Sequence, residues 1–288
     1  MISDITLGQY FPGKSVIHRL DPRTKILLTV LYIVAVFLAN TPIVFLLLAV
    51  SVFLTILISK ISLRVILRGI RPIIYVLIIT ALINVLMTKG NSEPLVSFWV
   101  IKIYKEGIVR AVFMALRVIL LIVGTSVLLT YTTSPISLTD GIEKLLAPLK
   151  KIGIPVHVFA MMMTIALRFI PTLVEETEKI MNAQKSRGAD FSTGSLIKRA
   201  KALVPILIPL FVSAFKRADE LAVAMECRCY RGDKNRTKLV KLTYKGIDFL
   251  WFGFGLLFLG VVIMLKIAPD YLSGIIPKTV ADIVFYRI

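Results

Sequence analysis

Residues 26–59 read ILLTVLYIVAVFLANTPIVFLLLAVSVFLTILIS and contain no charged side chain. The triplet Asn40-Thr41-Pro42 interrupts this stretch, and an Asn followed closely by Pro is a turn signal. Because a helix needs about 20 apolar residues to cross a bilayer, with a range of roughly 17–25, the stretch predicts two membrane-spanning helices. We place them at residues 24–40 and 42–59, joined by a tight turn.

Three further apolar runs follow, at residues 72–88, 111–135 and 249–265, and the second of these is broken only by Arg117. Five runs of this length are typical of membrane spans rather than of core helices in a soluble domain. A β-barrel would alternate apolar and polar residues, which Leu46-Leu47-Leu48 does not. The sequence therefore predicts an all-α integral membrane protein with about five transmembrane helices and a cytoplasmic set of amphipathic helices.

Composition agrees with this class. The chain has 288 residues and a formal charge of +18, yet 57% of it is hydrophobic and only 18% is charged. Disordered chains lack so many apolar residues, and a soluble nucleic-acid binder would have no place to bury them. The two cysteines, Cys227 and Cys229, are too few for a disulfide framework.

Charge asymmetry predicts the orientation, because loops on the cytoplasmic side carry an excess of Lys and Arg. The connection after the second span contains Lys60, Arg64, Arg68 and Arg71 and no acidic residue. We therefore expect the N-terminus inside and the C-terminus outside. The expected organisation is four spans in 1–133, a cytoplasmic coupling-helix region in 134–246, a fifth span in 247–267 and a C-terminal tail in 268–288.

The region 134–246 holds three predicted helices, over residues 137–151, 156–187 and 196–231. Gly188 is a helix-stop signal for the second, and Pro205 and Pro209 should bend the third. Residues 156–174 are apolar enough for a sixth span, but Arg168 would place a costly charge inside the membrane. We therefore expect that segment to lie in the membrane plane or obliquely to it.

Motifs of catalysis are absent from the sequence. It has no G-x-x-x-x-G-K-[ST] phosphate loop, no G-x-S-x-G and no H-E-x-x-H. His18 and His157 are isolated, and Cys227-x-Cys229 lacks the second pair that a zinc site needs. We expect no catalytic residue, no metal site and no cofactor bound by this chain.

Several stretches resemble one family. They are HRLDPRTK at 18–25, TTSP at 132–135, ALRFIP at 166–171, AQKSRG at 183–188 and AMECRCYRG at 224–232. Together they resemble the transmembrane (T) component of energy-coupling factor (ECF) transporters, EcfT, over residues 15–265. This family is related to the cobalt and nickel importer subunits.

The resemblance implies a scaffold in the cell membrane of a prokaryote. It would link two ABC-type ATPase subunits, which use ATP and Mg, to a substrate-binding S component for vitamin or micronutrient uptake. A small-Arg-small motif at the end of each coupling helix would dock one ATPase. The usual form is Ala-Arg-Gly, and the matching residues are Ser186, Arg187, Gly188, Cys227, Arg228 and Cys229. Arginine suits this role because its planar guanidinium binds carboxylates through two parallel hydrogen bonds.

An apolar surface on the same helices is the predicted contact for the S component, through Met161, Met162, Met163, Leu207 and Phe211. The lipid bilayer is the remaining expected partner, and nucleic acid is not expected. Two alternatives stay open. One is a dedicated nickel or cobalt importer subunit, and the other is a basic scaffold that binds anionic lipid through 134–246.

Overall fold

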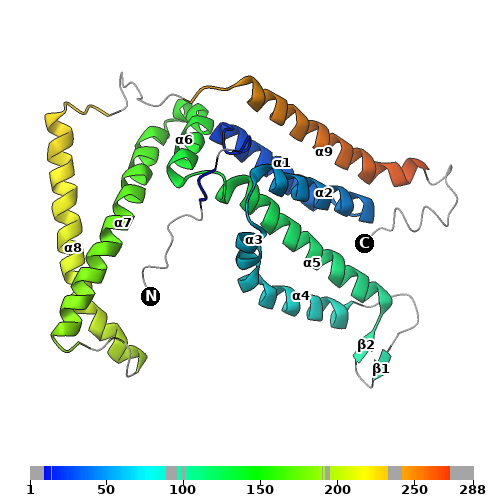
Figure 1. Ribbon diagram of the computed structural model, residues 1–288, viewed down its shortest axis with the longest axis horizontal. Coiled ribbons are helices and arrows are strands. Elements are labelled where there is room, and N and C mark those ends of the chain that lie inside the picture. Colours follow the sequence, from blue (N-terminus) through cyan, green and yellow to red (C-terminus); the bar gives the residue numbers. More distant parts are fainter. Residues whose placement is uncertain are drawn as a thin grey trace. The chain divides into compact units, whose positions relative to one another are not determined.

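The computed structural model describes residues 10–13, 15–88, 96–98, 101–189, 191, 195–232 and 242–272 (Figure 1). The chain divides into two compact units, which we treat separately. The bundle unit lies within residues 9–141 and 242–288, and the arm unit lies within residues 142–241. Apart from one short hairpin, every regular element is helical in the part described. The expected all-α class is confirmed.

The bundle unit contains the helices that the uncharged runs predicted. Its elements are α1 (Pro22–Leu38), α2 (Pro42–Ser59), α3 (Leu63–Ile70), the 3-10 turn η1 (Arg71–Ile73), α4 (Ile74–Met87), β1 (Val96–Phe98), β2 (Ile101–Ile103), α5 (Lys105–Thr125), the π-helical turn η2 (Ser126–Thr130) and α9 (Gly246–Leu272). Helix α6 (Pro135–Leu145) begins in this unit and ends in the arm unit. Both α1 and α2 start with proline, which has no N–H to leave unpaired in a first turn.

Within the described residues, five helical segments are long and apolar enough to cross a membrane. They are Pro42–Ser59, Leu63–Met87, Lys105–Thr130, Val156–Ser186 and Gly246–Ile267. Helix α1 has 17 residues, at the short end of the range for a span. The fourth segment is the one that the sequence placed in the membrane plane or obliquely, and that placement stays a prediction.

The core of the bundle unit forms where α1, α2, α5, η2 and α9 meet. Phe45, Leu48, Val127 and Val262 are buried there. A side chain at Gly124 would collide with the ring of Tyr32, whose Cε1, Cζ and hydroxyl atoms occupy the position of a Cβ. Glycine therefore lets α1 and α5 approach closely, and the Tyr32 hydroxyl donates a hydrogen bond to the Leu120 carbonyl at 2.8 Å.

The one charge inside the fourth apolar run finds a partner in the bundle. Arg117 donates a hydrogen bond through Nη2 to the carbonyl of Ala39, the C-terminal cap of α1. Its guanidinium also lies over the Phe45 ring, 5.5 Å from the centroid. Arg117 thus pairs a carbonyl that a helix end leaves without an intrahelical partner.

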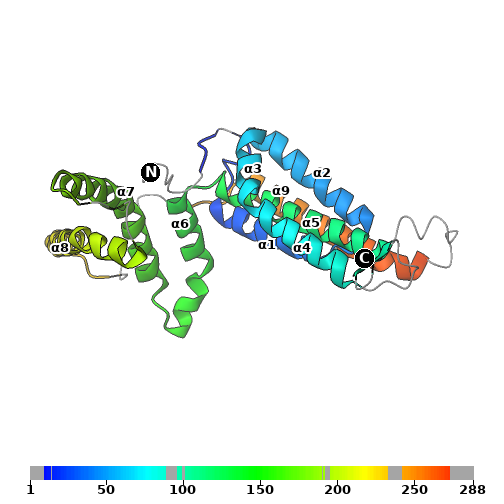
Figure 2. The ribbon, with the colours of Figure 1, turned by 90° about the horizontal axis from the view of Figure 1, so that it is seen from below.

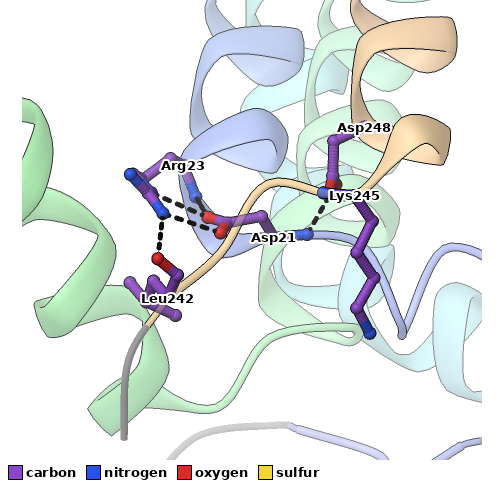
Figure 3. A network of polar contacts seen from close by, with 5 residues as sticks. All are labelled: Asp21, Arg23, Leu242, Lys245 and Asp248. Atoms are coloured by element: carbon purple, nitrogen blue, oxygen red, sulfur yellow. Dashed lines mark hydrogen bonds and ion pairs between the residues drawn. The ribbon is translucent and has the colours of Figure 1, made fainter.

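A polar clasp joins the start of α1 to the start of α9 (Figure 3). The Asp248 carboxylate is only 2% exposed and accepts hydrogen bonds from the N–H groups of Asp21 at 2.8 Å and Lys245 at 2.7 Å. Asp21 caps α1 and pairs with Arg23 at 3.0 Å. Arg23 in turn donates to the Leu242 carbonyl at 2.9 Å. The segment that leads into α9 is therefore fixed to α1 by charge-assisted bonds, which are stronger than neutral ones.

The hairpin lies in the loop between the third and fourth apolar runs, where no strand was predicted. Strands β1 and β2 pair antiparallel, with Val96 opposite Ile103 and Phe98 opposite Ile101. The β-branched and aromatic residues of these strands favour extended backbone. Strands of three residues are too short for a periodic signal in the sequence.

The arm unit is built on two long helices, α7 (Val156–Ser186) and α8 (Leu196–Cys227), which pack against each other. Between α6 and α7 the chain forms the 3-10 turn η3 (Ala147–Ile152). The predicted single helix over 137–151 is therefore wrong at its end, because Pro148 disfavours the α conformation before it and lacks an N–H. Figures 1 and 2 show that the first part of α8 lies at an angle to the rest, the bend expected from Pro205 and Pro209.

Polar side-chain contacts help to hold the arm unit together. The Arg217 guanidinium on α8 bonds the Glu176 carboxylate on α7 at 3.1 Å. The Nδ1 atom of His157, in the first turn of α7, lies 3.0 Å from the Glu143 carboxylate. These contacts link α8 to α7, and α7 to the segment before it.

Candidate functional site

The C-terminal end of α7 has a complete hydrogen-bonded cap. The Gly188 N–H donates to the Lys185 carbonyl at 2.9 Å, and the Ala189 N–H donates to the Gln184 carbonyl at 3.0 Å. Gly188 has φ 86°, in the left-handed region. This pair of bonds around a left-handed residue is the Schellman motif. Gly188 was predicted as a helix stop, and that is confirmed.

The end of α8 repeats this geometry with a different residue in the left-handed position. The Cys229 N–H donates to the Glu226 carbonyl at 2.8 Å, and the Tyr230 N–H donates to the Met225 carbonyl at 3.0 Å. Cys229 has φ 56°, a conformation that costs a residue with a Cβ about 1–2 kcal/mol. The predicted helix over 196–231 is therefore too long at its end, because the α8 backbone turns out of the helix at Cys229.

The two arginines consequently occupy the same position in the same motif. Arg187 precedes Gly188 and Arg228 precedes Cys229, so each is the capping residue just before the left-handed one. All six residues of the two small-Arg-small motifs are exposed. The sequence pointed to these residues because small side chains flank each arginine. The structure adds that the third residue of each motif takes the left-handed backbone conformation.

The two ends are far apart. The chain enters α8 only a few residues after α7 ends, and α8 has 32 residues. A straight helix of that length spans about 48 Å, and the bend shortens it. Figure 1 shows α7 and α8 ending at opposite ends of the pair. Arg187 and Arg228 therefore form two separate sites and cannot share one small ligand.

The positive charge at these two ends suits contact with anionic groups. An arginine at a helix C-terminus faces the negative end of the helix dipole, which favours its positive charge. Small neighbours leave the guanidinium accessible to a carboxylate from another protein. Within the described residues, no group of three or more His, Cys, Asp or Glu side chains is arranged to hold a metal ion.

The predicted S-component surface is exposed on both helices of the arm unit. On α8, Leu203, Leu207, Phe211 and Phe215 recur every four residues, and Leu207 and Phe211 are 49% and 62% exposed. We call these four residues the α8 apolar stripe. On α7, Met162 and Met163 are exposed and Met161 is partly buried. An apolar stripe of this length is open to a partner or to lipid.

Known proteins resemble this chain over nearly its whole length. The profile of the CbiQ family, described as cobalt transport protein, matches residues 13–239. A protein of Clostridium kluyveri, named energy-coupling factor transporter transmembrane protein EcfT, is 56% identical over 87% of this chain and 92% of its own length. The chain belongs to the EcfT family.

Two further members of this family are similar to the chain. The EcfT of Ruminiclostridium cellulolyticum is 52% identical over 92% of this chain and 98% of its own length. The EcfT of Bacillus subtilis is 48% identical over 86% of this chain and 93% of its own length. The chain is thus a multi-pass membrane protein, the transmembrane scaffold subunit of an energy-coupling factor transporter, and it works in a complex with other subunits.

Two of the features that the sequence did not predict in this EcfT chain are a backbone conformation and a polar contact. Sequence reasoning did not anticipate that Cys229 takes the left-handed position, although its alignment with Gly188 in the paired motifs carried that signal. It also missed the clasp around Asp248, since nothing local in the sequence connects residues 21 and 248. No periodic pattern could have revealed that contact.

Proposed function

We propose that this EcfT chain links two ABC-type ATPase subunits to a substrate-binding S component and transmits ATP-driven motion for vitamin or micronutrient uptake. The observation that carries the proposal is the repeated cap, which presents Arg187 and Arg228 alike at two distant helix ends. Two equal and separate binding ends suit two ATPases of similar shape. The chain itself would hold no ATP site and no cofactor, and ATP with Mg would be used by the partners.

Force would pass along the helices that carry these arginines. From Pro171 to Arg187 the helix rises about 24 Å, and the Arg217–Glu176 bridge holds α8 to α7. A displaced end would then move its helix as a rigid element. The α8 apolar stripe is the proposed S-component contact, with Met161, Met162 and Met163 as a second, adaptable part.

The test is charge reversal of both arginines. We expect Arg187→Glu combined with Arg228→Glu to abolish co-purification with the ATPases, because reversal in a docked ion pair costs several kcal/mol. The matched control is Lys185→Glu with Arg231→Glu, which changes the same charge at the same two ends outside the motif positions. Retention of both ATPases by the double arginine variant, or equal loss in the control, would refute the docking assignment.

The orientation is part of the same proposal. We place the N-terminus, the connection 60–71 and the coupling region 134–246 in the cytoplasm of a prokaryotic cell. In a variant that lacks the exposed Cys227 and Cys229, a cysteine introduced at Ser62 should react with a membrane-impermeant thiol reagent only after the cells are opened. Labelling of intact cells at that position would contradict the orientation.

A second candidate for the transported substrate is nickel or cobalt. It is favoured by the description of the CbiQ family as cobalt transport protein. Uptake of labelled cobalt by cells that express the complex, compared with cells that express the double arginine variant, would distinguish it from vitamin uptake. No difference between the two would exclude this candidate.

A further inference from the structure

A pocket of about 380 Å³ opens at one end of the bundle unit, where α2 ends and α3 begins. Its lining includes Ser15, His18, Lys60, Ser62 and Val65, together with the segment at Phe11. It belongs to the end of the bundle at which α1 starts and α2 stops (Figure 1). The pocket is therefore level with the ends of the apolar helices, the depth of phospholipid headgroups.

One wall of the pocket is held in place by a neutral histidine. The Nε2 atom of His18 lies 3.0 Å from the Phe11 carbonyl, and its Nδ1 lies 2.6 Å from the Ser15 hydroxyl. A carbonyl only accepts, so Nε2 carries the proton and Nδ1 accepts from Ser15. Burial lowers the pKa of His18, which keeps the ring neutral near pH 7. His18 therefore shapes the pocket, and the positive charge of the pocket comes from other residues.

The opposite wall is positive and rich in donors. Lys60 caps α2 with φ 56°, a left-handed turn that starts the connection to α3, and its side chain is exposed. Ser62 is the N-cap of α3, and its hydroxyl makes no capping bond. The Val65 N–H of α3 donates to the Ser62 carbonyl at 3.0 Å, and the earlier N–H groups at the start of a helix favour anions. Lys60, the Ser62 hydroxyl and the start of α3 thus converge on one cavity.

Helix α3 beside this pocket is amphipathic in the manner of helices that lie at a membrane surface. Leu63 and Leu67 are 60% and 64% exposed and lie on one side, one turn apart. Arg64 and Arg68 are one turn apart as well, and both are exposed. In Figure 1, α3 runs across the direction of α4, as a helix in the membrane plane would. Exposed leucines beside exposed arginines fit acyl chains and anionic headgroups together.

We propose that this pocket binds the headgroup of an anionic phospholipid. The phosphate would contact Lys60, Ser62 and the first turn of α3, and the acyl chains would lie along Leu63 and Leu67. Charge complementarity selects this occupant, because residues 60–68 contain three basic residues, Lys60, Arg64 and Arg68, and no acidic one. The site is independent of the ATPase-docking ends.

The test is native mass spectrometry of the full chain in neutral detergent with equal amounts of phosphatidylglycerol and phosphatidylcholine. The wild type should retain one phosphatidylglycerol in preference to phosphatidylcholine. Lys60→Gln should lower this preference roughly five-fold, as expected for one basic residue at an anionic surface. Ser62→Phe should lower it as well, because it fills the pocket mouth without changing charge and removes no capping bond.

Two control variants distinguish binding in the pocket from general attraction of an anionic lipid to basic residues. Arg71→Gln removes an exposed charge near the same end, and Lys105→Gln removes one at the start of α5. Both should keep the wild-type preference within about two-fold, less than the effect of one basic residue at the surface. Equal losses in Lys60→Gln and Arg71→Gln, or an unchanged Ser62→Phe, would overturn the pocket. Displacement of the lipid by inorganic phosphate would instead identify a free-anion site and overturn the lipid assignment.

Discussion

Replacement of Cys229 by glycine should stabilise the end of α8. Cys229 holds φ 56°, whereas the equivalent position at the end of α7 is Gly188. A Cβ in this conformation costs about 1 kcal/mol relative to glycine. Cys229→Gly removes that cost and leaves both capping hydrogen bonds possible. Gly188→Ala adds the cost to α7 for purely conformational reasons, since no atom lies within 4 Å of the Cβ position.

Hydrogen–deuterium exchange of the purified chain measures this effect directly. The amides of residue 229 and Tyr230 donate to Glu226 and Met225, so their exchange reports opening of the cap. One kcal/mol corresponds to roughly a five-fold change in the opening equilibrium. Amide exchange at the end of α8 should therefore be slower in Cys229→Gly, and exchange at residues 188 and 189 should be faster in Gly188→Ala. The control is Cys229→Ala, which removes the thiol but keeps the Cβ. If the alanine variant slows exchange as much as the glycine variant, the backbone explanation is wrong.

Three further results are expected. Asp248→Ala should lower the free energy of unfolding by about 3 kcal/mol in detergent titrations, since the buried Asp21 N–H and the part-buried Lys245 N–H lose a charged acceptor; a loss below 1 kcal/mol would contradict the clasp. Arg117→Met should cost about 2 kcal/mol in the same assay, because the Ala39 carbonyl is left unpaired in apolar surroundings, and an unchanged stability would show that this contact is dispensable. Leu207→Asp or Phe211→Asp should weaken S-component binding in co-purification while the ATPases stay bound; loss of the ATPases alone would place the stripe on the docking side.

Much of the helical framework could be predicted from the sequence, because charge is excluded from lipid whatever the tertiary contacts. The uncharged run at 26–59 and its turn at Asn40 correspond to α1 and α2. Gly188 follows the predicted helix over 156–187 and marks the end of α7 for a local steric reason. These signals are local, so they can be read without knowledge of the fold.

The unpredicted features depend on contacts between distant residues or on small shifts within a helix. The π-helical turn at Ser126–Thr130 extends the fourth run in a form that hydropathy does not distinguish from α-helix. The partner of Arg117 is a backbone carbonyl, and a carbonyl has no sequence signature. The left-handed Cys229 was hidden because that conformation is rare for residues other than glycine.

The repeated cap also bears on symmetry. The two motifs differ in sequence, Ser-Arg-Gly against Cys-Arg-Cys, but their backbones present an arginine in the same setting. A partner assembled from two equal halves would therefore meet a similar backbone shape twice on one chain. Swapping the two halves would leave the backbone setting of each arginine unchanged, so such a pair could be recruited in either order. The side chains that flank each arginine and the residues beyond the caps would then make the two ends unequal.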